Sequence, residues 1–250
     1  YEGTEKNVKY TIILGILFIL TNTFFGTAFD TTTKYVNELD IKWFHYYGIG
    51  NGFGLIIFLV YLLLKKKLKQ TIVLKNKSSY LIPVLRGLSF IPIPLIVFST
   101  LEKIDISVFT TILMTTPFFL YFWSKVIQNE KIDINIIILT IIGFAGVLII
   151  IKPALKDFTI TILICFIVPI YNSLASIIVS KYSKVASSDT YVLFFILPLI
   201  FLSLILCIIN PIKLSFSSLF IICLGGTFLI FAILFFTLAF HVAGNFSRLI

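Results

Sequence analysis

The sequence has little charge for its size. Of its 250 residues only 12% are Asp, Glu, Lys or Arg, whereas 59% are hydrophobic. A soluble domain usually carries about 25% charged and about 45–50% apolar residues. With a mean hydropathy of +1.08, a soluble fold of this length has no interior large enough for so much Ile, Leu and Phe. These values exclude soluble enzyme folds and secreted disulfide scaffolds, and they predict an integral membrane protein.

Residue types that carry catalysis or bind metals are also scarce. The three cysteines (Cys165, Cys207 and Cys223) lie inside apolar runs, with neither metal-ligand spacing nor a disulfide framework. The two histidines, His45 and His241, stand far apart near the ends of predicted spans. No Ser/His/Asp set, paired carboxylates or cysteine cluster occurs within the apolar runs. We therefore expect no enzyme activity, no metal site and no cofactor.

The alternation of polar and apolar residues that a membrane β-barrel needs, in runs of about ten, is missing as well. The apolar runs are continuous, as between residues 193 and 209, which is typical of helices that satisfy their own backbone groups in lipid. We predict an all-α, polytopic membrane bundle with about eight transmembrane helices. Their expected bounds are Tyr10–Lys34, Lys42–Leu64, Tyr80–Leu101, Ile106–Ile127, Ile134–Ile151, Phe158–Tyr182, Thr190–Ile209 and Leu219–Val242.

The net charge of +9 would indicate a nucleic-acid partner in a soluble protein. Here the basic residues lie between apolar runs, so they indicate topology, and no nucleic-acid partner is expected. With the N-terminus in the cytoplasm, thirteen Lys and Arg fall on the inner side and six on the outer side. The positive-inside rule therefore predicts a multi-pass protein with a cytoplasmic N-terminus. The abundance of Lys, Ile and Asn is typical of an AT-rich bacterial genome, which predicts a bacterial inner (cell) membrane.

A faint internal repeat links residues 98–104 with residues 236–242. Each segment closes one predicted span and starts the next after a very short turn. If the match reflects a repeat of five spans, an odd number, the second half crosses the membrane inverted relative to the first. Inverted repeats are typical of secondary transporters. We interpret residues 1–153 as one five-helix repeat and residues 154–250 as a second, incomplete repeat that ends as a ninth helix begins, and we expect about two further helices.

The middle of the chain carries a family pattern. It consists of a basic residue opening the third span, a proline in the fourth, an acidic residue closing it, and small residues in the fifth before a proline: Arg86, Pro117, Glu130, Gly143, Gly146, Val147 and Pro153. With this pattern the chain resembles the EamA-type half of the drug/metabolite transporter superfamily. The start of the chain, with Asp30 and Lys34 late in the first span, resembles the branch that includes S-adenosylmethionine carriers.

The resemblance implies ten helices in two inverted five-helix repeats around a central cavity. It also implies a secondary transporter that carries a small organic metabolite, an amino acid or an S-adenosylmethionine-like compound, by alternating access. The expected partners are that metabolite and membrane lipid, with proton or ion coupling and oligomeric state left open. An arginine that many relatives have early in the second span is absent, since Tyr46, Tyr47 and Gly48 stand there. The residues alone leave two alternatives open, a membrane-embedded lipid-handling enzyme and a passive channel.

Seven residues within the spans are candidates for the substrate pathway. Arg86 lies about 10 Å into its span at 1.5 Å per residue, where an arginine costs about 2.5–3.5 kcal/mol, so it has either a binding role or snorkels to the headgroups. Asp30 and Lys34 predict an i,i+4 ion pair that serves as a neutralised helix end, an outer gate or a coupling pair. The candidates are Asn22, Asp30, Lys34, Arg86, Tyr121, Tyr171 and Asn172.

The remaining candidates each have two interpretations. Asn22 either lines a cavity or makes an interhelical hydrogen bond. Tyr171 and Asn172 follow Pro169, so a helix break, an aromatic ring and an amide come together. Tyr121, late in the fourth span, either lines the cavity or belongs to an interfacial aromatic belt.

Glycine and proline mark expected packing sites and breaks. Glycines spaced four apart (Gly48 with Gly52, Gly50 with Gly54) favour close helix packing over phosphate binding, because no strand precedes them. The pairs at 143/146 and 225/226 are interpreted in the same way. Prolines that bend or interrupt the spans stand at positions 83, 92, 94, 117, 169 and 198.

Overall fold

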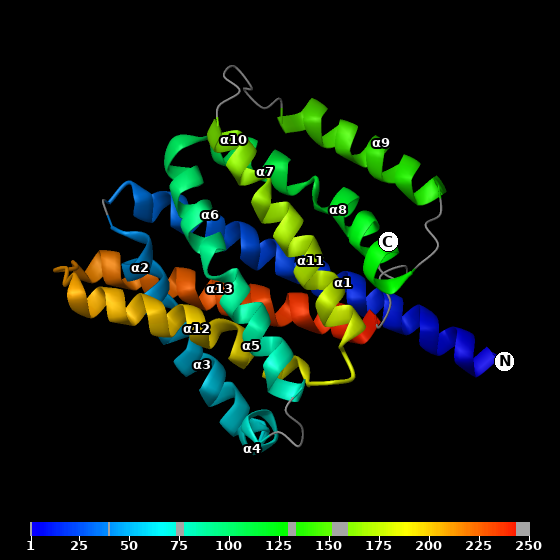
Figure 1. Ribbon diagram of the computed structural model, residues 1–250, viewed down its shortest axis with the longest axis horizontal. Helices are drawn as coiled ribbons and strands as arrows, with labels where there is room; N and C mark the ends of the chain where they lie inside the picture. The colour runs from blue at the N-terminus through cyan, green and yellow to red at the C-terminus, as the bar shows by residue number, and fades with distance from the viewer. Residues whose placement is uncertain (1, 40, 74–77, 130–133, 152–159, 244–250) are drawn as a thin grey trace.

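The computed structural model describes residues 2–39, 41–73, 78–129, 134–151 and 160–243, and within these ranges every regular element is a helix (Figure 1). The elements in the first part of the chain are α1 (Glu2–Asn37), α2 (Trp43–His45), the π-helix η1 (Tyr46–Gly50), α3 (Asn51–Leu64), α4 (Leu68–Ile72), α5 (Ser78–Phe90), α6 (Pro92–Lys103) and α7 (Ile106–Leu113). Those that follow are α8 (Thr116–Trp123), the π-helix η2 (Ser124–Gln128), α9 (Ile134–Ile151), α10 (Ile160–Cys165), α11 (Ile167–Lys181), α12 (Ser188–Ile209) and α13 (Phe216–Ala243).

Seven helical segments are long and apolar enough to cross a membrane, which confirms the prediction of a polytopic helical bundle. They coincide with seven of the eight predicted spans: Tyr10–Asn37, Trp43–Leu64, Ser79–Lys103, Ile106–Gln128, Ile160–Lys181, Ser188–Ile209 and Phe216–Val242. The other predicted span coincides with α9, Ile134–Ile151, in which Ile134–Gly146 is the apolar part whose residues are described in full. Large apolar side chains such as Leu64, Ile208 and Phe216 are exposed on the outside of the bundle, where they suit contact with lipid.

Three spans are broken into two helices each, and prolines lie at or close to the breaks. The third span changes from α5 to α6 at Ile91, where Pro92 has no N–H and the carbonyl of Leu88 accepts from Ile91 instead, at 3.3 Å. The fourth span breaks just before Pro117, and the sixth breaks at Phe166, ahead of the first turn of α11. By contrast, α5 and α12 continue through their internal prolines.

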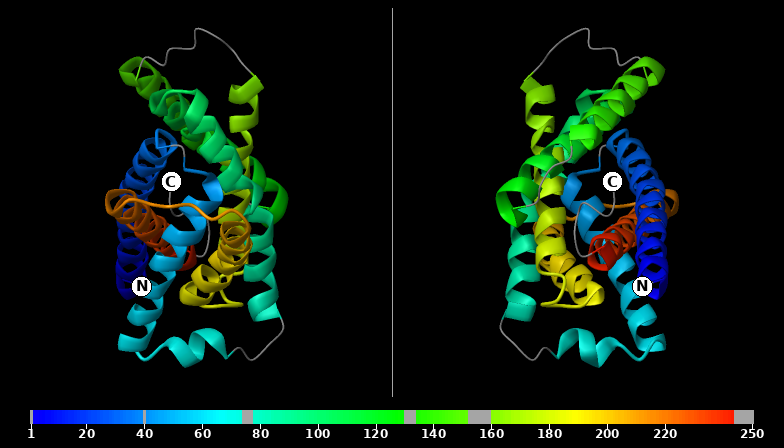
Figure 2. Two further views of the ribbon diagram at one scale, coloured as in Figure 1. Left: turned by 90° about the vertical axis from the view of Figure 1, so that its left-hand side faces the viewer. Right: turned by 90° about the vertical axis from the view of Figure 1, so that its right-hand side faces the viewer.

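Contacts between the two halves of the chain occur in matched pairs. Helix α1 lies along α13, as Figures 1 and 2 both show, and α6 contacts α10 and α11. Helix α3 packs on α13, and α5 packs on α12. Counted by spans, the contact of the first span with the eighth corresponds to the contact of the sixth with the third. The contact of the second span with the eighth corresponds in the same way to that of the seventh with the third.

Glycines bring the second span against the last two described helices. A Cβ on Gly226 would collide with the backbone of Gly50, and one on Gly54 would lie 2.6 Å from the carbonyl of Gly226. The prediction of close packing is therefore confirmed for Gly50 and Gly54. It is wrong for Gly52, and also for the glycines at 143 and 146, since a Cβ there would meet nothing within 4 Å. These three project away from neighbouring helices, so their small size has no packing role.

Candidate functional site

The bundle contains a partly open cavity of about 500 Å³, a volume typical of small-molecule binding sites. Its walls come from α1, from η1 through Tyr47, from the broken third, fourth and sixth spans, and from α12 and α13. Most of the lining is apolar, and a small number of polar and charged side chains interrupt it. We therefore take this cavity as the candidate functional site.

One face of α1 supplies a polar stripe to the cavity. Asn22, Thr23, Gly26, Thr27 and Asp30 all line it. These positions follow the i, i+4, i+8 spacing of one helix face, so one helix presents an amide, two hydroxyls and a carboxylate in a row.

Arg86 on α5 brings a positive charge to the same cavity. Its side chain is only 5% exposed, which rules out snorkelling to the headgroups. The guanidinium lies 4.3 Å from the ring centroid of Phe195 and 5.7 Å from that of Phe236. Its Nε and Nη1 are buried without a hydrogen-bond partner in the described chain. The cation is thus held by two aromatic rings and has no paired anion among the described residues.

Asp30 and Lys34 do not form the predicted ion pair. The Nζ of Lys34 donates to the carbonyl of Leu101 at 2.6 Å and to that of Ile104 at 3.4 Å. Lys34 therefore satisfies carbonyls at the C-terminal end of α6, which have no intrahelical partner, and it lies outside the cavity lining. The carboxylate of Asp30 lines the cavity with no ion pair or hydrogen bond to any described residue. The ion pair does not form because the long lysine side chain reaches the uncapped end of α6, where its hydrogen bonds stabilise more than a contact with a neighbour on its own helix.

Asn22, Tyr171 and Asn172 also line the cavity. The Nδ2 of Asn22 donates to the carbonyl of Ala232 at 2.9 Å, which ties α1 to α13. The hydroxyl of Tyr171 donates to the carbonyl of Arg86 at 2.8 Å and lies 3.0 Å from Ser89 Oγ. Tyr171 thereby fixes the backbone that carries the guanidinium, whereas the side-chain amide of Asn172 bonds to no described residue.

Tyr121 lies outside the cavity lining, unlike the other three aromatic and amide candidates. Its hydroxyl shares a 2.9 Å hydrogen bond with Thr140 Oγ1 on α9, so it holds the fourth span to the fifth. The side chain is almost completely buried, which also excludes the interfacial belt.

The helix breaks border the cavity. Pro94, Met114, Pro117 and Val168, each within a few residues of a break, belong to the lining. Irregular backbone is tolerated at membrane depth only inside protein or beside a polar cavity. The proline pattern of the sequence therefore indicates where the cavity lies.

Sequence reasoning missed several lining residues. Thr23 and Thr27 could have been found, because they share one helical face with Asn22 and Asp30. Phe195 and Phe236 could not, since nothing distinguishes the two rings that hold Arg86 from the other phenylalanines among the 27 in the chain.

Comparison with known proteins supplies independent findings. The model of the EamA-like transporter family matches residues 13–152. A solved structure, described only as a crystal structure of a protein, is similar with a TM-score of 0.69 at 14% identity, covering 96% of this chain and 81% of that one. At that identity the likeness shows a shared fold alone. No curated protein sequence matches significantly.

Proposed function

The chain belongs to the EamA-like transporter family, and on that premise we propose that it carries a small zwitterionic metabolite, an amino acid or S-adenosylmethionine-like compound, by alternating access. Members of the family are multi-pass membrane transporters of small molecules, and the seven apolar helices agree with that location.

One observation carries the ligand chemistry: the cavity holds two opposite charges that do not pair with each other. Arg86 and Asp30 both line it, and no described residue pairs with either side chain. A charge in a low-dielectric interior is costly unless it is paired and hydrogen-bonded. A ligand with one carboxylate and one ammonium group would neutralise both, with its carboxylate at Arg86 and its ammonium at Asp30. The α-amino carboxylate group, which amino acids and S-adenosylmethionine share, has this form.

Asn172 and the α1 threonines extend the site. The amide of Asn172 is free of described hydrogen-bond partners and lines the cavity, so it can bond to a polar group of the ligand. The apolar part of the lining suits an uncharged substituent. Lys34 and Tyr121 have no place in this site.

The matched contacts between the two halves support alternating access. A two-fold relation between inverted repeats requires contacts to occur in exchanged pairs, and the described spans have such pairs. Rocking of one half against the other then exposes a central site to each side in turn. The broken third, fourth and sixth spans supply the cavity-lining backbone in this mechanism.

Ligand stabilisation tests the proposal directly. Thermal melts of the purified protein with amino acids, S-adenosylmethionine, nucleosides, polyamines and organic acids should show a rise only with compounds that carry an α-amino carboxylate. A ligand at 100 times its Kd adds about 2.7 kcal/mol of stability. The deaminated and the decarboxylated analogue of each responding compound are the matched controls. Equal stabilisation by a simple organic acid would contradict the zwitterion.

Transport measurements separate a carrier from the alternatives. Proteoliposomes should show saturable uptake and counterflow of the responding compound, whereas a passive channel shows neither. Conversion of added phospholipid by the purified protein would favour the lipid-handling enzyme.

A further inference from the structure

The connection between the second and third spans carries a distinct surface. Helix α3 ends in a turn in which Lys67 N–H donates to the carbonyl of Leu62 and Lys66 N–H donates to that of Leu63. Lys66 adopts a left-handed φ of 55°, as in a Schellman motif. The turn redirects the chain into α4, which lies across the end of the bundle rather than along the spans (Figure 2). An orientation of this kind places a helix in the plane of the membrane surface.

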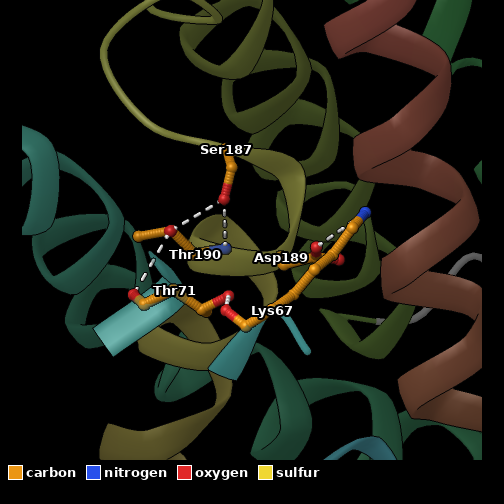
Figure 3. A network of polar contacts seen from close by, with 5 residues as sticks. All are labelled: Lys67, Thr71, Ser187, Asp189 and Thr190. Atoms are coloured by element: carbon orange, nitrogen blue, oxygen red, sulfur yellow. Dashed lines mark hydrogen bonds and ion pairs between the residues drawn. The ribbon is translucent and has the colours of Figure 1, made fainter. Parts of the chain in front are cut away.

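A polar network fixes α4 to the start of α12 (Figure 3). Lys67 Nζ lies 3.6 Å from Asp189 Oδ2, and the Asp189 side chain is only 11% exposed. Thr190 Oγ1 donates to the carbonyl of Thr71 at 3.4 Å, and Ser187 Oγ accepts from the N–H of Thr190 as the N-cap of α12. The connection is therefore held in a defined position, and one of its lysines is already paired.

The other three lysines in the described part of this connection face solvent. Lys65, Lys66 and Lys69 are exposed and form no ion pair with any described residue. Exposed apolar side chains flank them, since Leu64 is 80%, Ile72 49% and Val73 65% exposed. Positive charges bordered by bare apolar groups, at the point where an apolar span ends, form an amphipathic membrane-surface element.

We propose that this α4 surface, formed by Lys65, Lys66 and Lys69 with Leu64, Ile72 and Val73, binds the headgroups of anionic phospholipids. The three ammonium groups supply the charge complement of lipid phosphates, and the apolar side chains enter the acyl boundary beside them. A soluble anion would use the lysines and leave the apolar side chains in water, which is why the observations favour lipid. The surface lies at the end of the bundle and lines no part of the cavity, so this inference does not depend on the transported substrate.

The test compares lipid binding by two variants of equal charge. Lys65→Gln, Lys66→Asn and Lys69→Gln together remove the three charges, and Asn tolerates the left-handed φ at position 66. The matched control removes three exposed lysines at the opposite end of the spans: Lys42→Gln, Lys103→Gln and Lys213→Gln. Native mass spectrometry of each protein, titrated with phosphatidylglycerol and with phosphatidylcholine, counts the bound lipids.

We expect the unmodified protein and the control to prefer phosphatidylglycerol, and the α4 variant to lose about fivefold in that preference per lysine removed. The preference should fall as salt is raised. Equal preference in all three proteins, or displacement of the lipid by millimolar inorganic phosphate, would overturn the proposal. If the triple variant does not fold, Lys69→Gln alone should still show about a fivefold loss, and an unchanged preference there overturns it equally.

Discussion

Replacing Arg86 by methionine should separate its cost to stability from its role in binding. The substitution keeps a long side chain against Phe195 and Phe236 but removes the charge. It forfeits two cation–π contacts, of about 0.5–2 kcal/mol each. It also relieves an arginine burial penalty of at least about 2.5–3.5 kcal/mol. Because the two contributions are of similar size, the ligand-free variant should be at least about as stable as the unmodified protein.

Ligand binding should respond in the opposite direction. A hydrogen bond to a charged group contributes about 1.5–3 kcal/mol, so loss of the guanidinium should raise Kd by about 10- to 150-fold. If Kd rises about 100-fold, the stabilisation at a fixed ligand concentration falls from about 2.7 to about 0.4 kcal/mol. Thermal melts with and without the responding ligand measure both effects in one experiment. A variant that is more than about 2 kcal/mol less stable when ligand-free, yet has an unchanged ligand shift, would refute the reasoning and make Arg86 a structural residue.

Further predictions follow from single contacts. Asp30→Asn should leave the ligand-free protein at least as stable, because it removes a charge that no described residue pairs, and should abolish the stabilisation by α-amino carboxylates, as thermal melts with and without the ligand would show. Lys34→Met should lower stability by about 1 kcal/mol through loss of its bonds to the end of α6 and leave ligand Kd unchanged, as isothermal titration would show. Gly226→Ala should lower the melting temperature or prevent folding, since its Cβ would collide with backbone, whereas Gly52→Ala should be neutral or slightly stabilising. Lys66→Gly should raise stability by up to about 1 kcal/mol in thermal melts, because glycine adopts the left-handed conformation without strain.

The fold follows from the sequence because lipid imposes a simple rule, that apolar runs of sufficient length become helices. This rule located the spans, and the prolines located most of the breaks. It could not show that Gly52 has no part in close helix packing. Close packing depends on which way a helix face points, and the spacing of residues within one helix does not reveal the neighbouring helix.

The candidate site was only partly predictable for a similar reason. Charged and amide residues within spans are rare, so Asp30, Arg86 and Asn172 could be selected by type alone, and the structure places all three at one cavity. Lys34 has the same rarity, but its long side chain reaches the end of another helix. Tyr121 points to α9, a partner that no local pattern in the sequence indicates.

The contact between Gly50 and Gly226 has a mechanical consequence. At this crossing no side chains lie between the two helices. One helix can therefore rotate over the other there without a change of side-chain rotamer. The long seam between α1 and α13 is different, since the ring of Phe25 stacks against those of Phe231 and Phe235, and sliding along it requires rings to repack. The least costly motion of α13 therefore moves α1 with it as one rigid unit, which pivots at Gly50 and Gly226.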